Sequence, residues 1–203
     1  RILSPETTTR ETLEKLLREK LLWIYGKLGR KEEELRRAPR REFVTGEGFY
    51  YLGKKHRLKV LSRMESACQT RQLSLHQGRF FLREDALDKA REQFVRWYAQ
   101  RAAIWLTERM TDLAERVGAQ PAAFECRDLA NRWGSCTENG KVLIHWRAMM
   151  LPPTVIRYLV LHELVHLIEH NHSPDFYSRL RAAVPDFQKQ EEWLRLHGDD
   201  YDL

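Results

Sequence analysis

The chain is poor in cysteine and has no hydrophobic run long enough to cross a membrane. Its three cysteines, Cys68, Cys126 and Cys136, are odd in number and form no CxxC pair, which argues against a disulfide framework. The most apolar run, residues 158–168, falls short of the roughly 20 residues that span a bilayer. No signal peptide, internal repeat or low-complexity segment is visible. The sequence therefore predicts a cytoplasmic globular protein with reduced thiols and no membrane partner.

Charge is unevenly distributed along the chain. Residues 1–101 hold 24 Lys+Arg against 14 Asp+Glu, whereas residues 102–203 hold 11 against 15. A basic first half is compatible with contact to nucleic acid, although a solvated charged face is the more common reason for such an excess. Nucleic acid is therefore a candidate partner of the N-terminal half that charge alone does not establish.

The spacing of apolar residues predicts two long helices, over residues 7–38 and 83–117. The aromatic stripe of the second helix is interpreted as core packing. Between the helices, short aromatic and β-branched runs predict a small antiparallel sheet with hairpin turns at residues 53–55 and 77–78. The predicted strands are residues 43–45, 49–52, 58–60, 73–75 and 80–82. We expect residues 1–83 to form an N-terminal helix and β module, and residues 84–203 to form the core.

The second half begins with a strand over residues 124–129 and a hairpin ending at residues 142–146, with a turn at Glu138-Asn139-Gly140. Pro152-Pro153 then opens a helix that is apolar on nearly every side and is predicted to run to about Glu169. Such a helix is buried. Two shorter helices are predicted from Ser173-Pro174-Asp175 and from Pro185-Asp186.

The buried helix carries His162-Glu163-Leu164-Val165-His166. At about 3.6 residues per turn, histidines four apart project from one face, so both imidazoles can bind one metal ion. Glu163 lies one step round the helix, where its carboxylate can reach a water on the open side of the metal and act as general base. Chance produces this HExxH pattern in roughly a few chains per hundred of this length. The pattern predicts a zinc site with its own base.

A tetrahedral catalytic zinc needs a third protein ligand. His172 stands six residues after the second motif histidine and can return to the metal if the helix ends near His170, with Asn171 adopting a left-handed turn. His170 itself and a carboxylate from residues 191–192 are the alternatives. His172 is preferred because His170 still points along the helix.

The hairpin supplies the candidate substrate contacts. Trp133, Gly134 and Ser135 lie at its start, where a glycine lets an extended substrate approach the backbone closely. His145, at its end, is a candidate for stabilising an oxyanion. A lone histidine of this kind is more often a satisfied polar group.

Several separate segments together carry a family resemblance. They are Phe49-Tyr50-Tyr51-Leu52-Gly53, Arg132-Trp133-Gly134-Ser135-Cys136, Trp146-Arg147, Leu151-Pro152-Pro153, His162-Glu163-Leu164-Val165-His166 and Asn171-His172-Ser173 ahead of Phe176-Tyr177. With them the chain resembles the YgjP-like metal-dependent hydrolases, a zincin group similar to the SprT-like proteases. The resemblance implies that His172 rather than His170 completes the zinc site, and that the Trp-Gly-Ser-Cys hairpin lies beside the active-site cleft. His145 stands where the family usually has asparagine.

Together, the motif and the resemblance predict an α+β fold: a zincin-like metallopeptidase core, in which the HExxH helix packs with helices and a small antiparallel sheet, plus an N-terminal helix and β-rich lobe. The predicted function is a zinc-dependent hydrolase, a metallopeptidase that uses a metal-bound water, Glu163 as base and a peptide or protein as substrate. The alternatives are a nucleic-acid-associated, SprT-like protease and a non-catalytic, metal-stabilised interaction module.

Overall fold

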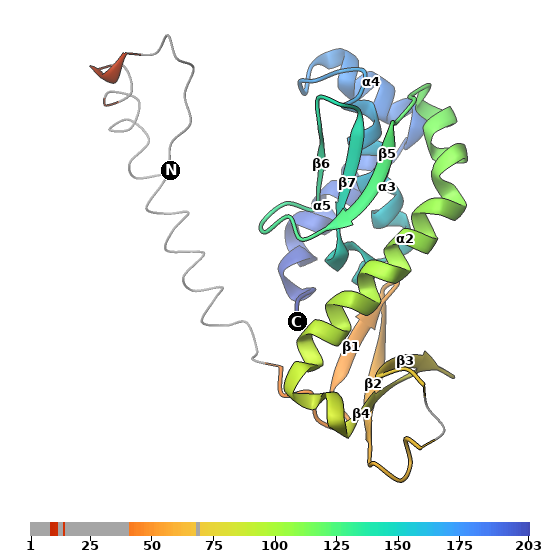
Figure 1. Ribbon diagram of the computed structural model, residues 1–203. Helices are drawn as coiled ribbons and strands as arrows, with labels where there is room; N and C mark the ends of the chain where they lie inside the picture. The colour runs from red at the N-terminus through yellow and green to blue at the C-terminus, as the bar shows by residue number, and fades with distance from the viewer. Residues whose placement is uncertain (1–8, 12–13, 15–40, 68–69) are drawn as a thin grey trace. The chain divides into compact units, whose positions relative to one another are not determined.

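The computed structural model describes residues 9–11, 14, 41–67 and 70–203 (Figure 1). Its contacts divide the chain into two units, Arg1–Arg40 and Arg41–Leu203, whereas the sequence predicted a boundary after residue 83. The helix predicted over residues 7–38 lies outside the described residues except at residues 9–11 and 14.

The first sheet has four strands, β1 (Gly48–Tyr51), β2 (Lys54–Leu61), β3 (Leu73–His76) and β4 (Arg79–Arg83), in the order β1-β2-β4-β3. Both hairpins are antiparallel as predicted, but β2 and β4 pair in parallel, so the prediction of an antiparallel sheet is wrong at its centre. In this order β3 takes the outer position, and β4 lies between β2 and β3. Residues 43–45, predicted as a strand, form none.

The two hairpins turn through Leu52-Gly53 and Gln77-Gly78, in which all four residues have positive φ. This is the type I′ geometry that matches the twist of antiparallel strands. Gly53 also lies against Pro152, whose Cα would be 3.0 Å from an added Cβ. The first hairpin therefore docks on the start of the metal-site helix.

A short 3-10 helix, η1 (Glu84–Lys89), leads into α2 (Ala90–Val117), which ends at Gly118 in the left-handed conformation. Phe94 of α2 stacks on Phe49 of β1, with ring centroids 4.3 Å apart, and its ring lies 5.1 Å from that of Phe80 in β4. The aromatic stripe is thus core packing, as predicted. The buried residues of α2 recur mostly three and four apart: Ala90, Phe94, Tyr98, Ala102, Trp105, Leu106, Leu113, Ala114 and Val117.

The second sheet has three strands, β5 (Ala123–Arg127), β6 (Gly134–Cys136) and β7 (Lys141–His145), in the order β5-β7-β6. The β6–β7 hairpin is antiparallel as predicted, and β5 runs parallel to β7. This order makes β6 an edge strand, and the metal-site helix packs against both β6 and β7 (Figure 1).

The remaining elements are η2 (Trp146–Met150), α3 (Pro153–Val165), α4 (Pro174–Ala183), α5 (Phe187–His197) and η3 (Gly198–Asp200). Nine residues of α3 are buried, in agreement with its apolar sequence. It ends at Val165, a turn earlier than predicted, where i−3 hydrogen bonds begin: the Leu167 N–H donates to the Leu164 carbonyl at 3.1 Å and the Ile168 N–H to the Val165 carbonyl at 2.9 Å. In the described part of the chain, no helix has both the length and the apolar character to span a membrane.

Candidate metal centre

Three histidines converge at the end of α3. His162 lies in the helix, His166 is its C-terminal cap and His172 precedes α4, and one ring nitrogen of each lies within 4.8 Å of the other two. The Nε2 atoms of His162 and His172 are 3.2 Å apart. Two ligands of a tetrahedral zinc, each at about 2.0–2.1 Å from the metal, stand about 3.3 Å apart. The spacing of this pair therefore fits one zinc ion.

Neighbouring groups orient the three rings. The Nδ1 atom of His166 is 3.1 Å from the Glu169 carbonyl oxygen, so this nitrogen donates to the backbone and Nε2 is left as the metal-binding atom. Phe176 of α4 packs against all three histidines, with ring centroids 4.6 to 5.0 Å away. Sequence reasoning gave Phe176 no role at the metal site and named it only among the segments of the family resemblance.

Burial favours the neutral imidazoles of His162 and His166, and the neutral form is the one that binds a metal. It lowers the pKa of His162 to about 4, with the neighbouring His166 and His172 adding to the effect. Burial also lowers the pKa of His166. A donor set of three converging imidazoles fits a divalent zinc ion.

The turn that brings His172 back to the other two histidines differs from the predicted one. Every described non-glycine residue with positive φ lies before residue 131, so the expectation of a left-handed Asn171 is wrong. The early end of α3 supplies the change of direction instead, and the Ser173 N–H closes the turn on the Asn171 carbonyl at 2.7 Å. The Ser173 hydroxyl then caps α4 by accepting from the Phe176 N–H.

The alternative third ligands lie apart from this cluster. His170 is exposed and is absent from the group of converging metal-binding side chains found among the described residues. Glu191 and Glu192 are also exposed, and Glu192 forms an ion pair with Arg195. Of the candidates, His172 is the one that the structure places beside His162 and His166.

Glu163 is buried beside the histidines, with 8% of its surface exposed. Its carboxyl group lies against Gly134 of β6, where a Cβ atom would stand 2.6 Å from Oε1. Only glycine leaves room for this carboxyl group. Burial raises the pKa of Glu163 to about 7, against the opposing charge of Arg132. A carboxyl group with such a pKa can take up and release a proton near neutral pH.

Strand β6 presents free backbone groups beside Glu163. The Trp133 carbonyl accepts from the His145 N–H, and the Thr137 N–H donates to the first residue of β7, each at 2.9 Å. Because hydrogen-bonded and non-bonded pairs alternate in an antiparallel ladder, the backbone groups of Gly134 and Cys136 face the open edge. This edge can accept an extended chain.

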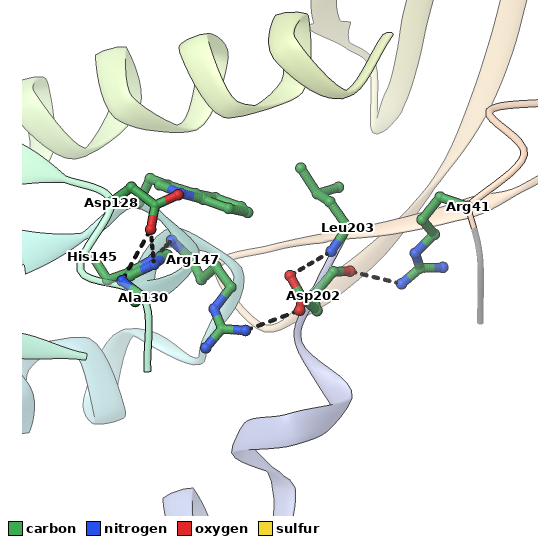
Figure 2. A network of polar contacts seen from close by, with 8 residues as sticks. Arg41, Asp128, Ala130, His145, Arg147, Asp202 and Leu203 are labelled. Atoms are coloured by element: carbon green, nitrogen blue, oxygen red, sulfur yellow. Dashed lines mark hydrogen bonds and ion pairs between the residues drawn. The ribbon is translucent and has the colours of Figure 1, made fainter. Parts of the chain in front are cut away.

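The other candidate substrate contacts divide into two groups. Trp133 and Ser135 lie at or next to the β6 edge, where the Ser135 hydroxyl accepts from Arg132 at 3.2 Å. His145 is 2% exposed, its Nδ1 accepts from the Arg147 N–H at 3.1 Å, and its Nε2 faces Asp128 at 3.3 Å (Figure 2). With both ring nitrogens engaged inside the protein, His145 finds no support as a substrate contact.

The polar contacts of His145 continue through Arg147 to Asp202, near the C-terminus. The Arg147 guanidinium bonds the Asp202 carboxylate at 3.0 Å and lies 4.8 Å from the centre of the Trp133 ring. The Asp202 carbonyl in turn accepts from Arg41 at 3.0 Å (Figure 2). These contacts hold the residue that immediately precedes β6. Sequence reasoning did not foresee them, because they join residues from opposite ends of this unit.

Comparison with known proteins assigns the chain to a family. A comparison with curated proteins finds no significant match. Among solved structures, the metallopeptidase zymogen abylysin of Pyrococcus abyssi matches with 18% identity and a TM-score of 0.42, over 46% of this chain and 92% of its own. The model of the YgjP-like metallopeptidase domain matches residues 1–197. The chain therefore belongs to the YgjP-like family of metallopeptidases.

Proposed function

We propose that the chain is a zinc-dependent peptidase in which His162, His166 and His172 hold the metal and Glu163 is the general base. The observation that carries this proposal is the convergence of three ring nitrogens within 4.8 Å beside a buried carboxyl group. A zinc ion bound there supplies a Lewis acid that polarises a carbonyl and acidifies water.

The protein's own contribution to the reaction is proton transfer. Glu163 takes the proton of the attacking water and returns it to the leaving nitrogen, for which a pKa of about 7 is well matched. Gly134 fixes the place of this carboxyl group by leaving it space. The base is thus held by packing rather than by a hydrogen bond.

The substrate is an extended segment of a peptide or protein. It adds to the open edge of β6 through the backbone groups of Gly134 and Cys136, which carries a peptide bond past Glu163. Direct contacts from Trp133 and Ser135 at this edge remain part of the proposal. A non-catalytic module would have no use for a buried carboxyl group beside the metal site. The nucleic-acid-associated alternative stays a prediction, to be tested by salt-dependent DNA binding.

Replacing Glu163 by Gln tests the proposal. The variant keeps the shape of the side chain and loses the base, so we expect turnover of unfolded protein substrates to fall by about 10²–10⁴-fold. Zinc content, measured by mass spectrometry of the purified protein, should be unchanged. Full activity in Glu163→Gln would refute the mechanism, and activity that survives complete removal of metal would refute the metal-dependent function itself.

A further inference from the structure

A groove that the proposed hydrolysis does not use lies between edge strand β3 and the first half of α2. Its volume is about 910 Å³, near the top of the range of about 300–1,000 Å³ for ligand pockets. Leu73, Ser74 and Leu75 form one wall, and residues of α2 from Gln93 to Ile104 form the other. Neither Glu163 nor any of the three histidines lines it. The groove is therefore a separate feature of the surface.

The groove is positively charged. Its lining includes no Asp or Glu and four arginines, Arg71, Arg83, Arg96 and Arg101. Arg83 is paired with Asp85, at 2.9 Å from Nε. Arg71 and Arg96 are exposed, and neither makes an ion pair or hydrogen bond with a described residue. Their charge is available to a ligand, which must accordingly be anionic.

The wall formed by β3 has unpaired backbone groups. In the described part of the chain, β3 pairs with β4 alone and forms the border of the sheet (Figure 1). The Arg83 N–H donates to the Gln72 carbonyl at 3.0 Å. Since the antiparallel ladder alternates, Gln72 and Ser74 face β4, and the N–H and C=O groups of Leu73 and Leu75 face outward. An extended peptide can add there as a further strand.

The aromatic side chains favour a peptide over nucleic acid. Trp97 in the lining makes edge contacts with Tyr51 and Phe80, each with ring centroids 4.9 Å apart, and the Arg101 guanidinium lies 6.0 Å from its centre. A nucleic-acid base needs an open aromatic face on which to stack. Ile104, 46% exposed at the groove, instead offers an apolar contact to a side chain.

The arginines of the groove are not explained by a need to protect the edge strand β3 from pairing with other chains. Edge strands are commonly guarded by charges on the strand itself, and the sequence of β3, Leu-Ser-Leu-His, carries no Lys, Arg, Asp or Glu. The arginines instead lie on the opposite wall, in α2, and near the start of β3. A chain added to β3 would lie between them. We propose that this groove binds an acidic, extended segment of a partner protein, added to β3 as a strand with its carboxylates on Arg71 and Arg96.

The test measures binding rather than hydrolysis, so it does not depend on the proposed peptidase function. A short fluorescein-labelled peptide of alternating glutamate and valine is titrated with the full chain carrying Glu163→Gln, and binding is followed by fluorescence anisotropy. A second peptide has the same sequence with alternate backbone nitrogens methylated, and a third probe is a single-stranded DNA oligonucleotide of similar net charge.

The double variant Arg71→Glu/Arg96→Glu should bind the acidic peptide at least about tenfold more weakly, because two attractive charges become repulsive. Arg79→Glu, at an exposed arginine outside the groove, is the matched control and should bind nearly as well as the parent. Melting temperatures and zinc content establish that the variants are folded. The methylated peptide should also bind weakly, because it cannot form the strand ladder.

Three results would overturn the proposal. Equal binding of the methylated peptide would show that β3 does not accept a strand. Binding of the DNA at least as tight as that of the peptide would assign the groove to nucleic acid. An unchanged affinity in the double variant would place the peptide elsewhere on the protein.

Discussion

The two edge strands, β3 and β6, share a backbone arrangement and differ in what surrounds them. Each leaves two residues with N–H and C=O groups facing outward, Leu73 and Leu75 in one and Gly134 and Cys136 in the other. The helix that packs against β6 carries the buried carboxyl group of Glu163 and two of the three converging histidines. The groove beside β3 contains arginines, which can bind an anionic group but offer no catalytic residue. A free strand edge is thus a general site for an extended chain, and the neighbouring side chains decide whether that chain is cut or only held.

The largest difference between the two edges should follow loss of the metal. His172→Ala removes one of three ligands, so we expect zinc to fall from about one ion per chain to nearly none and hydrolysis to disappear. Binding of the acidic peptide to the β3 groove should be unaffected. His170→Ala, four residues from His166 and outside the cluster, is the control and should retain its zinc. Normal zinc in His172→Ala would instead reopen the choice of third ligand.

A smaller effect is expected from the single methyl group of Gly134→Ala. Its Cβ would stand 2.6 Å from Glu163 Oε1, so the carboxyl group must move, and a displacement of about 1 Å can cost about 10²-fold in rate. The loss should appear in kcat, with zinc content unchanged. Gly78→Ala in the β3–β4 turn is the matched change on the other sheet. An added Cβ there meets only Nδ1 of His56, at 4.0 Å, and the positive φ costs stability alone. Equal activities of the two variants would show that Gly134 does not position the base.

Ionic strength should separate the edges further. Between roughly 0.01 M and 0.15 M salt the Debye length falls from about 30 Å to about 8 Å. Binding of the acidic peptide beside Arg71 and Arg96 should weaken several-fold over this range. Hydrolysis of an uncharged peptide at the β6 edge should change by less than about twofold, because it depends on backbone pairing and on groups next to the reacting bond. If peptide binding at β3 and hydrolysis at β6 depended equally on salt, the two edges would not differ in the charge that acts on their ligands.

The sequence predicted the histidine cluster better than the sheets. Histidines four apart on a helix must share a face, so His162 and His166 could be placed without knowledge of the rest of the chain. The parallel pairing of β2 with β4 could not be foreseen, because it joins strands that are not neighbours in the sequence. The fit of Glu163 against Gly134 was also out of reach, because it joins a helix to a strand through a contact that spacing does not encode. Sequence reasoning assigned Gly134 to the substrate alone; in the structure, the carboxyl group of Glu163 fills the space that its missing side chain leaves.

The smallest predicted effect concerns the polar network that holds the start of β6 and has no counterpart at β3 among the described residues. Burial lowers the pKa of His145, as does the charge of Arg147, against the opposing attraction of Asp128. The pKa of His145 in the folded protein therefore lies below its value of about 6.5 in the unfolded chain. As pH falls below about 6.5, His145 is protonated in the unfolded chain before it is protonated in the folded protein, and this favours unfolding. The stability that His145 contributes is complete above about pH 6.5 and is lost as pH falls from there toward the folded pKa.

His145→Asn isolates this contribution, because the amide oxygen can still accept from the Arg147 N–H and cannot titrate. Urea unfolding of the metal-free proteins at several pH values would then show the wild type losing more stability below about pH 6.5 than the variant does. All other histidines are common to the two proteins, so their contributions cancel in the difference. Parallel curves would mean that His145 keeps its ordinary pKa, and that the anchoring of Trp133 at the catalytic edge does not depend on a neutral imidazole.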